Sequence, residues 1–288
     1  MAKKFFLVGH YGALGDFILT WPALFCLKKL FPTYNFIGIG HQPFLQLAIQ
    51  QGIFNKGYDM DSANMVNFFT GKFLPKDIPP PDGAALWQIN KNQVVELLEI
   101  GATLPVVAIN PYPPVDVHVA KYYCEELSLH FNLDIPENLA NFYPSQKNCS
   151  DYVLIHPGSG SLAKNQQPYF YLKLAGRLRS MGITNIRYIM GPVEKELNID
   201  DFFLGEAIEY SNDLNSLVSI LQPARLYIGN DSGVSHLAAA LGTPTIALYK
   251  TTDPKIWGVI GKKVMHIKTD NIKNVFAAIN RSINKLLV

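Results

Sequence analysis

The sequence lacks the features that would place it in several large classes of protein. Charged residues make up 17% of its 288 residues and the net charge is only +2, which argues against a disordered chain and against strong nucleic-acid binding. It has no run of 18 uncharged apolar residues, so we expect no membrane-spanning helix. The three cysteines are far apart and match neither a disulfide framework nor a metal-binding spacing, which favours a reducing compartment.

Arginine is missing from the first half of the chain. Residues 1–145 hold nine lysines and twelve acidic residues, a net charge of −3, whereas residues 146–288 hold sixteen lysines and arginines against eleven acidic residues, a net charge of +5. A positive second half is compatible with an anionic ligand there. Glycines at 9–15 interrupt the apolar N-terminal stretch and no cleavage pattern follows, so we expect no signal peptide. We predict a cytoplasmic protein with at most peripheral membrane association and no nucleic-acid partner.

Short strand-like and helix-like segments alternate along both halves of the chain. In the first half, apolar runs and helical spacing predict strands at 5–8, 35–39 and 106–109 and helices at 17–31, 44–51, 91–100 and 116–131. Residues 56–83 end near three consecutive prolines and predict a long, partly irregular loop. In the second half the same patterns predict strands at 152–156, 186–190 and 207–210 and helices at 169–181, 213–221 and 271–287.

This alternation predicts an α/β protein with two Rossmann-like, doubly wound domains facing a central cleft. Residues 136–150 are polar and weakly periodic, as is typical of a domain linker. We therefore expect an N-terminal domain at 1–145, a C-terminal domain at 146–270 and a terminal helix at 271–288.

The densest motif is residues 226–249, in which an apolar run, a polar turn, an alanine-rich helical run and a second apolar run predict a β-α-β unit. Asn230, Asp231 and Ser232 offer capping side chains, and Gly233 lets the backbone approach a ligand closely. The helix that follows begins with unpaired N–H groups that suit a phosphate, and His236 lies near its first turn. An ordinary capped helix in an α/β core, with His236 as a structural residue, would produce the same pattern.

Two further turns follow predicted strands in the second half. Residues 156–161 read His-Pro-Gly-Ser-Gly-Ser, and Lys164 comes shortly after them. Ser159 and its neighbours offer hydroxyl and N–H groups to a phosphate that Lys164 would neutralise, although a solvated loop has the same composition. The segment is not a Walker loop, because the G-K-[ST] ending is missing. Glu194 follows the strand at 186–190, where a carboxylate can bind a ribose diol or lie on the surface of a short helix.

The remaining turn spans residues 9–16 and ends at Asp16. Its G-x-x-G-x-x-G spacing differs from the G-x-G-x-x-G of dinucleotide-binding folds, so a nicotinamide cofactor is not indicated. Asp16 stands where a helix begins, and the sequence leaves open whether it caps that helix or acts as a catalytic base.

Taken together, these motifs resemble glycosyltransferase family 9, the family of the lipopolysaccharide heptosyltransferases. The resemblance is carried by Gly15-Asp16 with Pro22-Ala23-Leu24, by the 156–159 turn with Lys164, by residues 230–245 and by Thr252-Asp253-Pro254 with Trp257. It implies a GT-B fold whose C-terminal domain binds the nucleotide-sugar donor and whose tail helix crosses back to the first domain. It also implies inversion without a metal or another cofactor, with which the absence of a D-x-D motif agrees.

The resemblance implies roles for individual residues. Asp16 matches the general base, Ser159 and Lys164 match the loop that contacts the donor diphosphate, and Glu194 matches the acid that holds the ribose. The donor-binding turn corresponds to Asp231, Ser232, Gly233 and His236. We expect transfer of a sugar, heptose from ADP-heptose, onto a lipopolysaccharide or another surface-glycan acceptor. The first half is net acidic and has no arginine, which argues against a strongly anionic inner core as the acceptor.

Two other functions are compatible with the same scaffold. A nucleotide-sugar 2-epimerase would need acid and base side chains besides Asp16, and the sequence offers no obvious set. A non-catalytic nucleotide-sugar binding protein would not need a base in the domain opposite the Lys164 loop.

Overall fold

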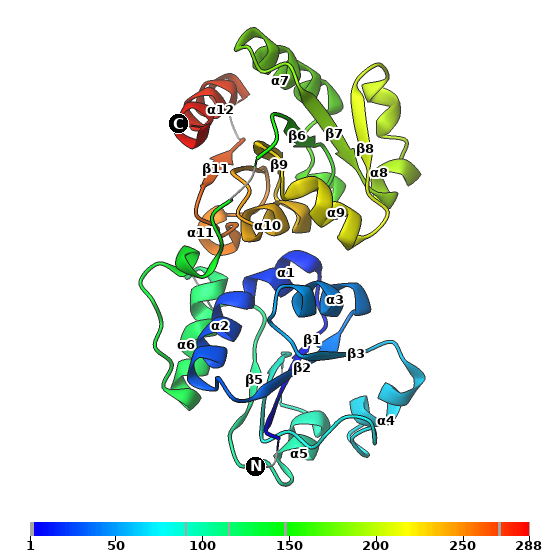
Figure 1. The fold of residues 1–288 in the computed structure, drawn as a ribbon, viewed down its shortest axis with the longest axis vertical. Coiled ribbons are helices and arrows are strands. Elements are labelled where there is room, and N and C mark those ends of the chain that lie inside the picture. The colour runs from blue at the N-terminus through cyan, green and yellow to red at the C-terminus, as the bar shows by residue number, and fades with distance from the viewer. Residues whose placement is uncertain (1–2, 90, 115, 147–148, 270–271, 288) are drawn as a thin grey trace. The chain divides into compact units, whose positions relative to one another are not determined.

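The computed structural model describes residues 3–89, 91–114, 116–146, 149–269 and 272–287. The chain divides into two compact units, Met1–Glu137 and Asn138–Val288, each built around its own parallel sheet (Figure 1). The predicted α/β class is confirmed. The division between the units falls at the start of the predicted linker, 136–150.

The first unit contains a five-stranded sheet in the order β3-β2-β1-β4-β5, with every neighbouring pair parallel. Its strands are β1 Phe5–His10, β2 Asn35–Gly40, β3 Lys56–Asp59, β4 Gly83–Trp87 and β5 Val106–Ile109. Its α-helices are α1 Leu14–Leu19, α2 Trp21–Leu30, α3 Gln42–Gln50, α4 Val66–Phe69, α5 Gln93–Glu99 and α6 Val119–Phe131.

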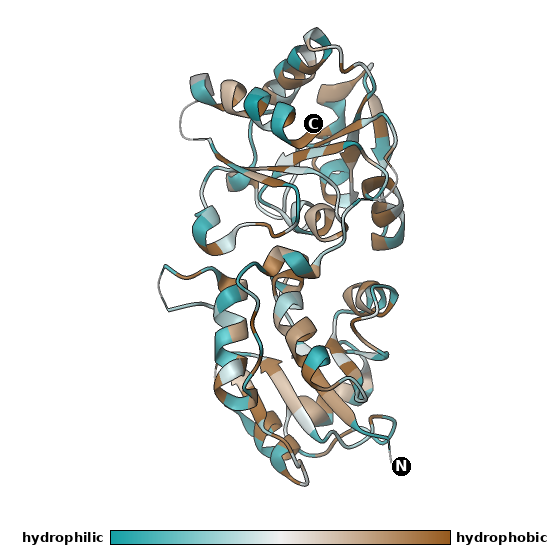
Figure 2. Ribbon diagram, turned by 60° about the vertical axis from the view of Figure 1, so that its left-hand side comes forward, coloured by the Kyte–Doolittle hydropathy of each residue, from teal (hydrophilic) through white to brown (hydrophobic). Residues whose placement is uncertain are grey.

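Both faces of this sheet are buried, as continuous apolar strands require. On one face Phe6 stacks on Phe31 and makes an edge-to-face contact with Phe131, which lie at the ends of α2 and α6. On the other face, alternate strand residues such as Leu7 and Leu86 pack with residues of α4 and α5. The strands at the centre of the sheet are accordingly mostly hydrophobic (Figure 2).

The second unit contains a six-stranded parallel sheet in the order β11-β10-β9-β6-β7-β8. Its strands are β6 Val153–His156, β7 Ile186–Met190, β8 Ala207–Tyr210, β9 Leu226–Asn230, β10 Thr245–Tyr249 and β11 Val264–Lys268. Its α-helices are α7 Pro168–Ser180, α8 Pro192–Glu196, α9 Leu214–Leu221, α10 Gly233–Ala240, α11 Pro254–Trp257 and α12 Ile272–Leu287.

The strand order reverses once in each sheet. In the first unit the reversal lies between β1 and β4, and in the second it lies between β6 and β9. Open parallel sheets bind ligands at the carboxyl ends of the strands that flank such a reversal. The fold therefore marks the ends of β6 and β9, and those of β1 and β4, as the places to look for a site.

The terminal helix α12 packs on the second unit. Val275, Phe276, Ile279 and Ile283 share a core with residues of β6, β7, β9 and α7, and the ring of Phe276 stacks on Phe170 with centroids 5.0 Å apart. Their spacing places them on one side of the helix. The family resemblance implied that this helix crosses back to the first unit, whereas its buried side belongs to the core of the second.

Two smaller expectations concern cysteines and membranes. Cys26, Cys124 and Cys149 are all free thiols, the first two buried and the third exposed. Within the residues that the structure describes, no helix combines the length and the apolar character that crossing a membrane requires.

Candidate functional site

The candidate site lies at the strand reversal of the second unit. His156 ends β6 and Asn230 ends the neighbouring strand β9, with His156 paired in register to Gly229. The loops that leave these two strands carry most of the residues selected from the sequence. Their proximity therefore follows from the topology.

Helix α10 begins directly at this edge. Ser232 is its N-cap, and the Ser232 side chain accepts a hydrogen bond from the backbone N–H of Ser235 at 3.3 Å. The Ser235 hydroxyl donates to the carbonyl of Asn230, which ties the turn to the end of the strand. Gly233 is the first helical residue, so the first turn offers backbone N–H groups and partial positive charge to an anion.

Asp231 is the centre of a charged cluster. Its Oδ2 atom accepts hydrogen bonds from Lys164 Nζ at 2.8 Å and from the Thr252 hydroxyl, while its Oδ1 atom lies 3.8 Å from His236 Nε2. The Asp231 side chain is only 4% exposed, against 32% for Lys164. Burial raises the pKa of Asp231, but the contacts with His236, Lys164 and Thr252 outweigh it and hold this pKa well below its usual range.

His236 faces this cluster with one nitrogen only. Its Nε2 atom points at Asp231, whereas its Nδ1 atom is buried and has no hydrogen-bond partner in the structure. A buried polar atom without a partner is costly, so it marks a place where a polar ligand would be stabilising.

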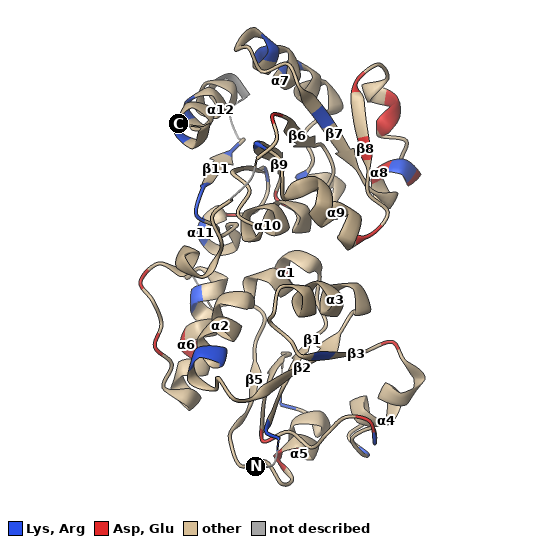
Figure 3. Cartoon of the chain, viewed as in Figure 1, with Lys and Arg blue, Asp and Glu red and all other residues tan. Residues whose placement is uncertain are grey.

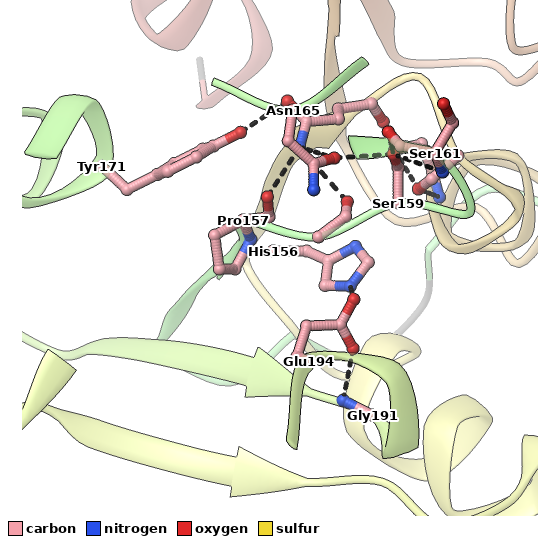
Figure 4. A network of polar contacts seen from close by, with 12 residues as sticks. His156, Pro157, Ser159, Ser161, Asn165, Tyr171, Gly191 and Glu194 are labelled. Carbon is pink, nitrogen blue, oxygen red and sulfur yellow. Dashed lines mark hydrogen bonds and ion pairs between the residues drawn. The ribbon is translucent and has the colours of Figure 1, made fainter. Parts of the chain in front are cut away.

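The loop after β6 is held to β9 by Asn230. The Asn230 side-chain amide donates to the carbonyl oxygens of Pro157 at 2.8 Å and Gly158 at 3.2 Å, and its Oδ1 atom accepts from the Tyr171 hydroxyl. The Ser159 hydroxyl lies 2.6 Å from Asn165 Oδ1 and 2.7 Å from the Ser161 carbonyl (Figure 4). Ser159 is therefore part of the internal bonding of the loop.

Glu194 lies on the short helix α8, and it is only 5% exposed. Its Oε2 atom accepts the Gly191 backbone N–H at 2.8 Å, and its Oε1 atom lies 3.5 Å from His156 Nε2 (Figure 4). Burial raises the pKa of Glu194, but His156 and the Gly191 N–H have the opposite effect and leave this pKa below its usual value. The carboxyl group is thus ionised and held at the edge of the site.

Gly158 is required where it lies, because Glu194 occupies the space beside it. A Cβ atom on Gly158 would stand 1.7 Å from Glu194 Oε1, whereas one on Gly160 would meet nothing within 4 Å. We predict that Gly158→Ala lowers the free energy of unfolding by about 1–3 kcal/mol through overpacking, and that Gly160→Ala has no comparable effect. Urea unfolding of both variants measures this, and equal stability of the two would show that Glu194 moves aside at no cost.

Asp16 belongs to the first unit, in the first turn of α1. Its Oδ2 atom and His10 Nε2 each lie 3.5 Å from the position that a Cβ of Gly12 would take, so both flank this glycine after β1. Burial raises the pKa of Tyr123, and the negative charge of Asp16 adds to this effect. Burial, and to a lesser degree the charge of His41, lower the pKa of His10 to about 3, so His10 is neutral beside this carboxylate.

The structure brings most of the predicted residues together. Those in the second unit lie around the ends of β6, β7 and β9: Ser159, Lys164, Glu194, Asp231, Ser232, Gly233 and His236. Two polar residues of the site carry no prediction from the sequence: no motif marks Asn165, and His156 only begins the turn at 156–161. Thr252 had been noted as part of the resemblance, and its contact with Asp231 gives it a place here.

The charges of the two units differ in kind as well as number. Lysines are scattered over the first unit (Figure 3). In the second unit, Lys164 donates to Asp231 at 2.8 Å and Lys250 donates to the Asn165 carbonyl at 2.9 Å. Among the described residues, no group of three or more His, Cys, Asp or Glu side chains is placed to hold a metal ion. Lys164 and the N-terminus of α10 both offer positive charge to an anionic ligand at this edge of the sheet.

Comparisons with known proteins agree with this geometry. The profile described as "Glycosyltransferase family 9 (heptosyltransferase)" matches residues 115–282. A curated relative, lipopolysaccharide heptosyltransferase 1 of Pseudomonas aeruginosa, is 24% identical over 145 residues, which are 47% of this chain and 41% of that protein. The chain thus matches well under two thirds of the relative's length.

Two solved structures share the fold along almost the whole chain. A family 9 glycosyltransferase from Veillonella parvula superposes with a TM-score of 0.77 at 17% identity, covering 100% of this chain and 98% of that one. The E. coli heptosyltransferase WaaC, solved with ADP, gives a TM-score of 0.74 at 19% identity, covering 98% and 99%. These likenesses establish the GT-B type of fold, with two Rossmann-like domains. Because the family profile also covers more than half of the sequence, the chain belongs to glycosyltransferase family 9.

Proposed function

We propose that this protein is an inverting, metal-independent glycosyltransferase that moves a heptose from ADP-heptose to a surface-glycan acceptor such as lipopolysaccharide. The observation that carries the proposal is the group formed by Lys164, Asp231, His236 and the start of α10, with Glu194 held at the same sheet edge. An anion site beside a fixed carboxylate suits a nucleoside diphosphate. The anion site would bind its phosphates, and the carboxylate would accept hydrogen bonds from the hydroxyls of its ribose. The E. coli heptosyltransferase WaaC, which has a similar fold, was solved with ADP.

The second unit binds and stabilises the departing diphosphate. When the bond between the sugar and the diphosphate breaks, the leaving group takes the electron pair and its negative charge grows. Lys164 and the N–H groups of the first α10 turn face that charge, so they stabilise the transition state more than the ground state. These groups supply positive charge of the kind that a metal ion supplies in other transferases.

The first unit contributes the base. The acceptor hydroxyl oxygen attacks the anomeric carbon of the sugar, Asp16 takes the hydroxyl proton, and the bond to the diphosphate oxygen breaks on the opposite side. A single displacement of this kind inverts the anomeric centre. The absence of arginine from residues 1–145 favours an acceptor with few phosphates. We place the reaction in the cytoplasm, with at most peripheral contact with the membrane.

Nucleotide binding tests the donor half of this proposal. We expect calorimetry with ADP, GDP, UDP and CMP to show selective binding of ADP, and Lys164→Ala to weaken it about tenfold or more, because a charge-assisted contact with phosphate is lost. Lys262→Ala, which removes an exposed lysine of the same unit, serves as the matched control. Preference for UDP or GDP would leave a transferase but remove heptose, and no binding at all would refute the donor site.

A further inference from the structure

The first unit has a strand reversal of its own, between β1 and β4, and two unpaired polar atoms lie at it. His10 ends β1, Trp87 ends β4, and the two residues are paired in register, so their side chains point to the same face of the sheet. Their ring centroids are 6.5 Å apart, and the residues are only 4% and 3% exposed. His10 Nδ1 and Trp87 Nε1 are both buried, and neither has a hydrogen-bond partner in the structure.

Unpaired atoms of this kind gather at the two strand reversals. Five buried side-chain atoms in the described part of the chain lack a partner, namely His10 Nδ1, the Tyr11 hydroxyl, Trp21 Nε1, Trp87 Nε1 and His236 Nδ1. Four of them belong to a reversal, His236 to the proposed donor site, and Trp21, the first residue of α2, is the exception. Each such atom is costly unless a polar ligand pairs with it. The pattern therefore points to a ligand in the first unit as well.

The unpaired atoms lie beside Asp16. A Cβ atom on Gly12 would stand 3.2 Å from His10 Cε1, 3.5 Å from His10 Nε2 and 3.5 Å from Asp16 Oδ2. Gly12 is exposed, and it has no side chain to cover these two groups. A ligand held by His10 would therefore lie within reach of the proposed base.

Aromatic rings continue from this pair toward the solvent. Tyr123 of α6 packs edge-on against Trp87 with centroids 5.6 Å apart, and its hydroxyl donates to the Pro111 carbonyl at 2.7 Å. This bond fixes the turn after β5, in which the next residue, Tyr112, is 61% exposed. Ligand sites are typically lined by aromatic rings with a few polar groups that fix orientation. A tyrosine ring offers a ligand both an apolar face and a hydroxyl.

Positive charge is scarce at the same edge of the sheet. Lys91 is the only lysine or arginine in the connections that leave the five strands there, residues 11–13, 41, 60–62, 88–92 and 110–118. Lys91 donates to both carboxylate oxygens of Glu99, at 2.7 and 2.8 Å, so its charge is already matched. His41 likewise faces Asp61, with Nδ1 and Oδ2 3.7 Å apart.

Lysines of the adjoining helices do not change this balance. Lys121, in the first turn of α6, pairs with Glu125 at 3.5 Å, and Lys72 follows α4, which packs on the opposite face of the sheet. Burial lowers the pKa of His10 to about 3, so His10 offers hydrogen bonds without positive charge. A negatively charged ligand would therefore meet the Asp16 carboxylate at an edge whose lysines are already paired, which is unfavourable.

We propose that the ends of β1, β4 and β5 form the acceptor subsite and that it takes an uncharged sugar, whose hydroxyls bond to His10 Nδ1 and Trp87 Nε1 and whose ring lies against Tyr112. Its assignment to the acceptor rests on the proposed function, whereas the class of ligand rests on the unpaired atoms and the charges. Trp87 Nε1 can only donate, and a neutral imidazole has one donor and one acceptor. Sugar hydroxyls do both, so they match either atom. The sugar that receives the transferred unit is then neutral, not acidic or phosphorylated.

The indole N–H signals of the nitrogen-15-labelled full-length protein test this subsite. The chain has three tryptophans, and the Trp87 signal is identified by its loss in Trp87→Phe. The probes are the methyl glycosides of glucose, galactose and mannose, and their acidic counterparts glucuronate, galacturonate and mannose 6-phosphate. We expect at least one neutral glycoside to shift the Trp87 signal saturably, and its acidic counterpart to bind about tenfold more weakly or worse, because Asp16 repels it. Equal or tighter binding of the acidic sugars, or no shift with any neutral one, would overturn the proposal.

Two variants test the placement of the sugar. Tyr112→Ala should weaken binding of that neutral sugar about three- to tenfold, because a ring contact is lost. Gly12→Ala should weaken it about tenfold or more, because the added methyl group fills the space between His10 and Asp16. Tyr169→Ala, which removes a tyrosine of the second unit that is 66% exposed, should match the wild type. Wild-type affinity in either of the first two variants would refute the placement.

Calorimetry with ADP on the same proteins separates this inference from the proposed function. All three variants should bind ADP as the wild type does, because the residues that we propose to bind the donor lie in the second unit. ADP binding without sugar binding would refute the subsite alone, whereas a wild type that binds the sugar and no nucleotide would refute the donor site alone. Urea unfolding confirms that each variant is folded.

Discussion

Asp231→Asn is expected to lower the free energy of unfolding by about 3 kcal/mol, the largest stability effect of any substitution at the site. The Asp231 carboxylate accepts from Lys164 and Thr252 and faces His236, so a neutral amide leaves a lysine without its counter-charge. The loss lies at the lower end of the range for buried ion pairs because the Lys164 side chain is one-third exposed. Urea unfolding at neutral pH measures it.

The same substitution should change how stability depends on pH. The pKa of Asp231 is lower in the folded protein than its ordinary value of 3.8, so its contribution is complete above that value and is lost as the pH falls below about 4. The stability difference between wild type and variant should therefore shrink in that acidic range. Asp201→Asn, an exposed carboxylate of the same unit, is the control. If the difference in the free energy of unfolding between wild type and Asp231→Asn stayed the same in that acidic range, the shape of the side chain, and not its charge, would explain the loss of stability.

Asp16→Asn is expected to reduce turnover by about 10²–10⁴-fold, because an amide cannot take the acceptor proton. ADP affinity should stay as in the wild type, since the residues that we propose to bind the donor lie in the second unit. The measurement is release of ADP from ADP-heptose, with and without deacylated lipopolysaccharide as the acceptor. An unchanged rate would remove Asp16 from the mechanism.

A matched variant separates chemistry from folding in this experiment. Asp77→Asn replaces an exposed carboxylate in the same unit and should leave turnover unchanged. If Asp16→Asn also lowered the free energy of unfolding by more than about 1 kcal/mol, its role at the start of α1 would be structural as well, as for an acidic residue near a helix N-terminus.

Sequence patterns located most elements of the second unit closely but missed its strand β11 and two strands of the first unit. Strands β7 and β8 coincide with the predicted 186–190 and 207–210. Strand β3, Lys56–Asp59, lies inside the segment expected to be irregular. It was missed because an edge strand, with only one neighbour, can carry polar residues such as Lys56 and Asp59, and these hide the apolar pattern of a strand. Strand β4 was missed because its first three residues, Gly-Ala-Ala, have little apolar bulk, although all five residues are buried.

The site was predictable to the extent that its residues follow strands. Asp231, Lys164 and Ser232 stand in turns at strand ends, and topology brings such turns together. The burial of Glu194 was not predictable, because an acid after a strand has the same pattern whether it is exposed or covered. What covers it is Gly158 and His156, which lie almost 40 residues earlier in the chain and meet Glu194 only once β6 and β7 have paired.

The continuity of each unit along the chain has a consequence for biosynthesis. All five strands of the first sheet come from residues 1–137. They can therefore pair before the ribosome has made the 151 residues that follow (288 − 137). At synthesis rates of about 5–20 residues per second, the ribosome needs roughly 8–30 s to complete those residues. Parallel sheets form slowly, and until they are complete their unpaired strand edges are prone to aggregation. The order of translation therefore gives the unit that carries Asp16 time to fold before synthesis of the second unit is complete.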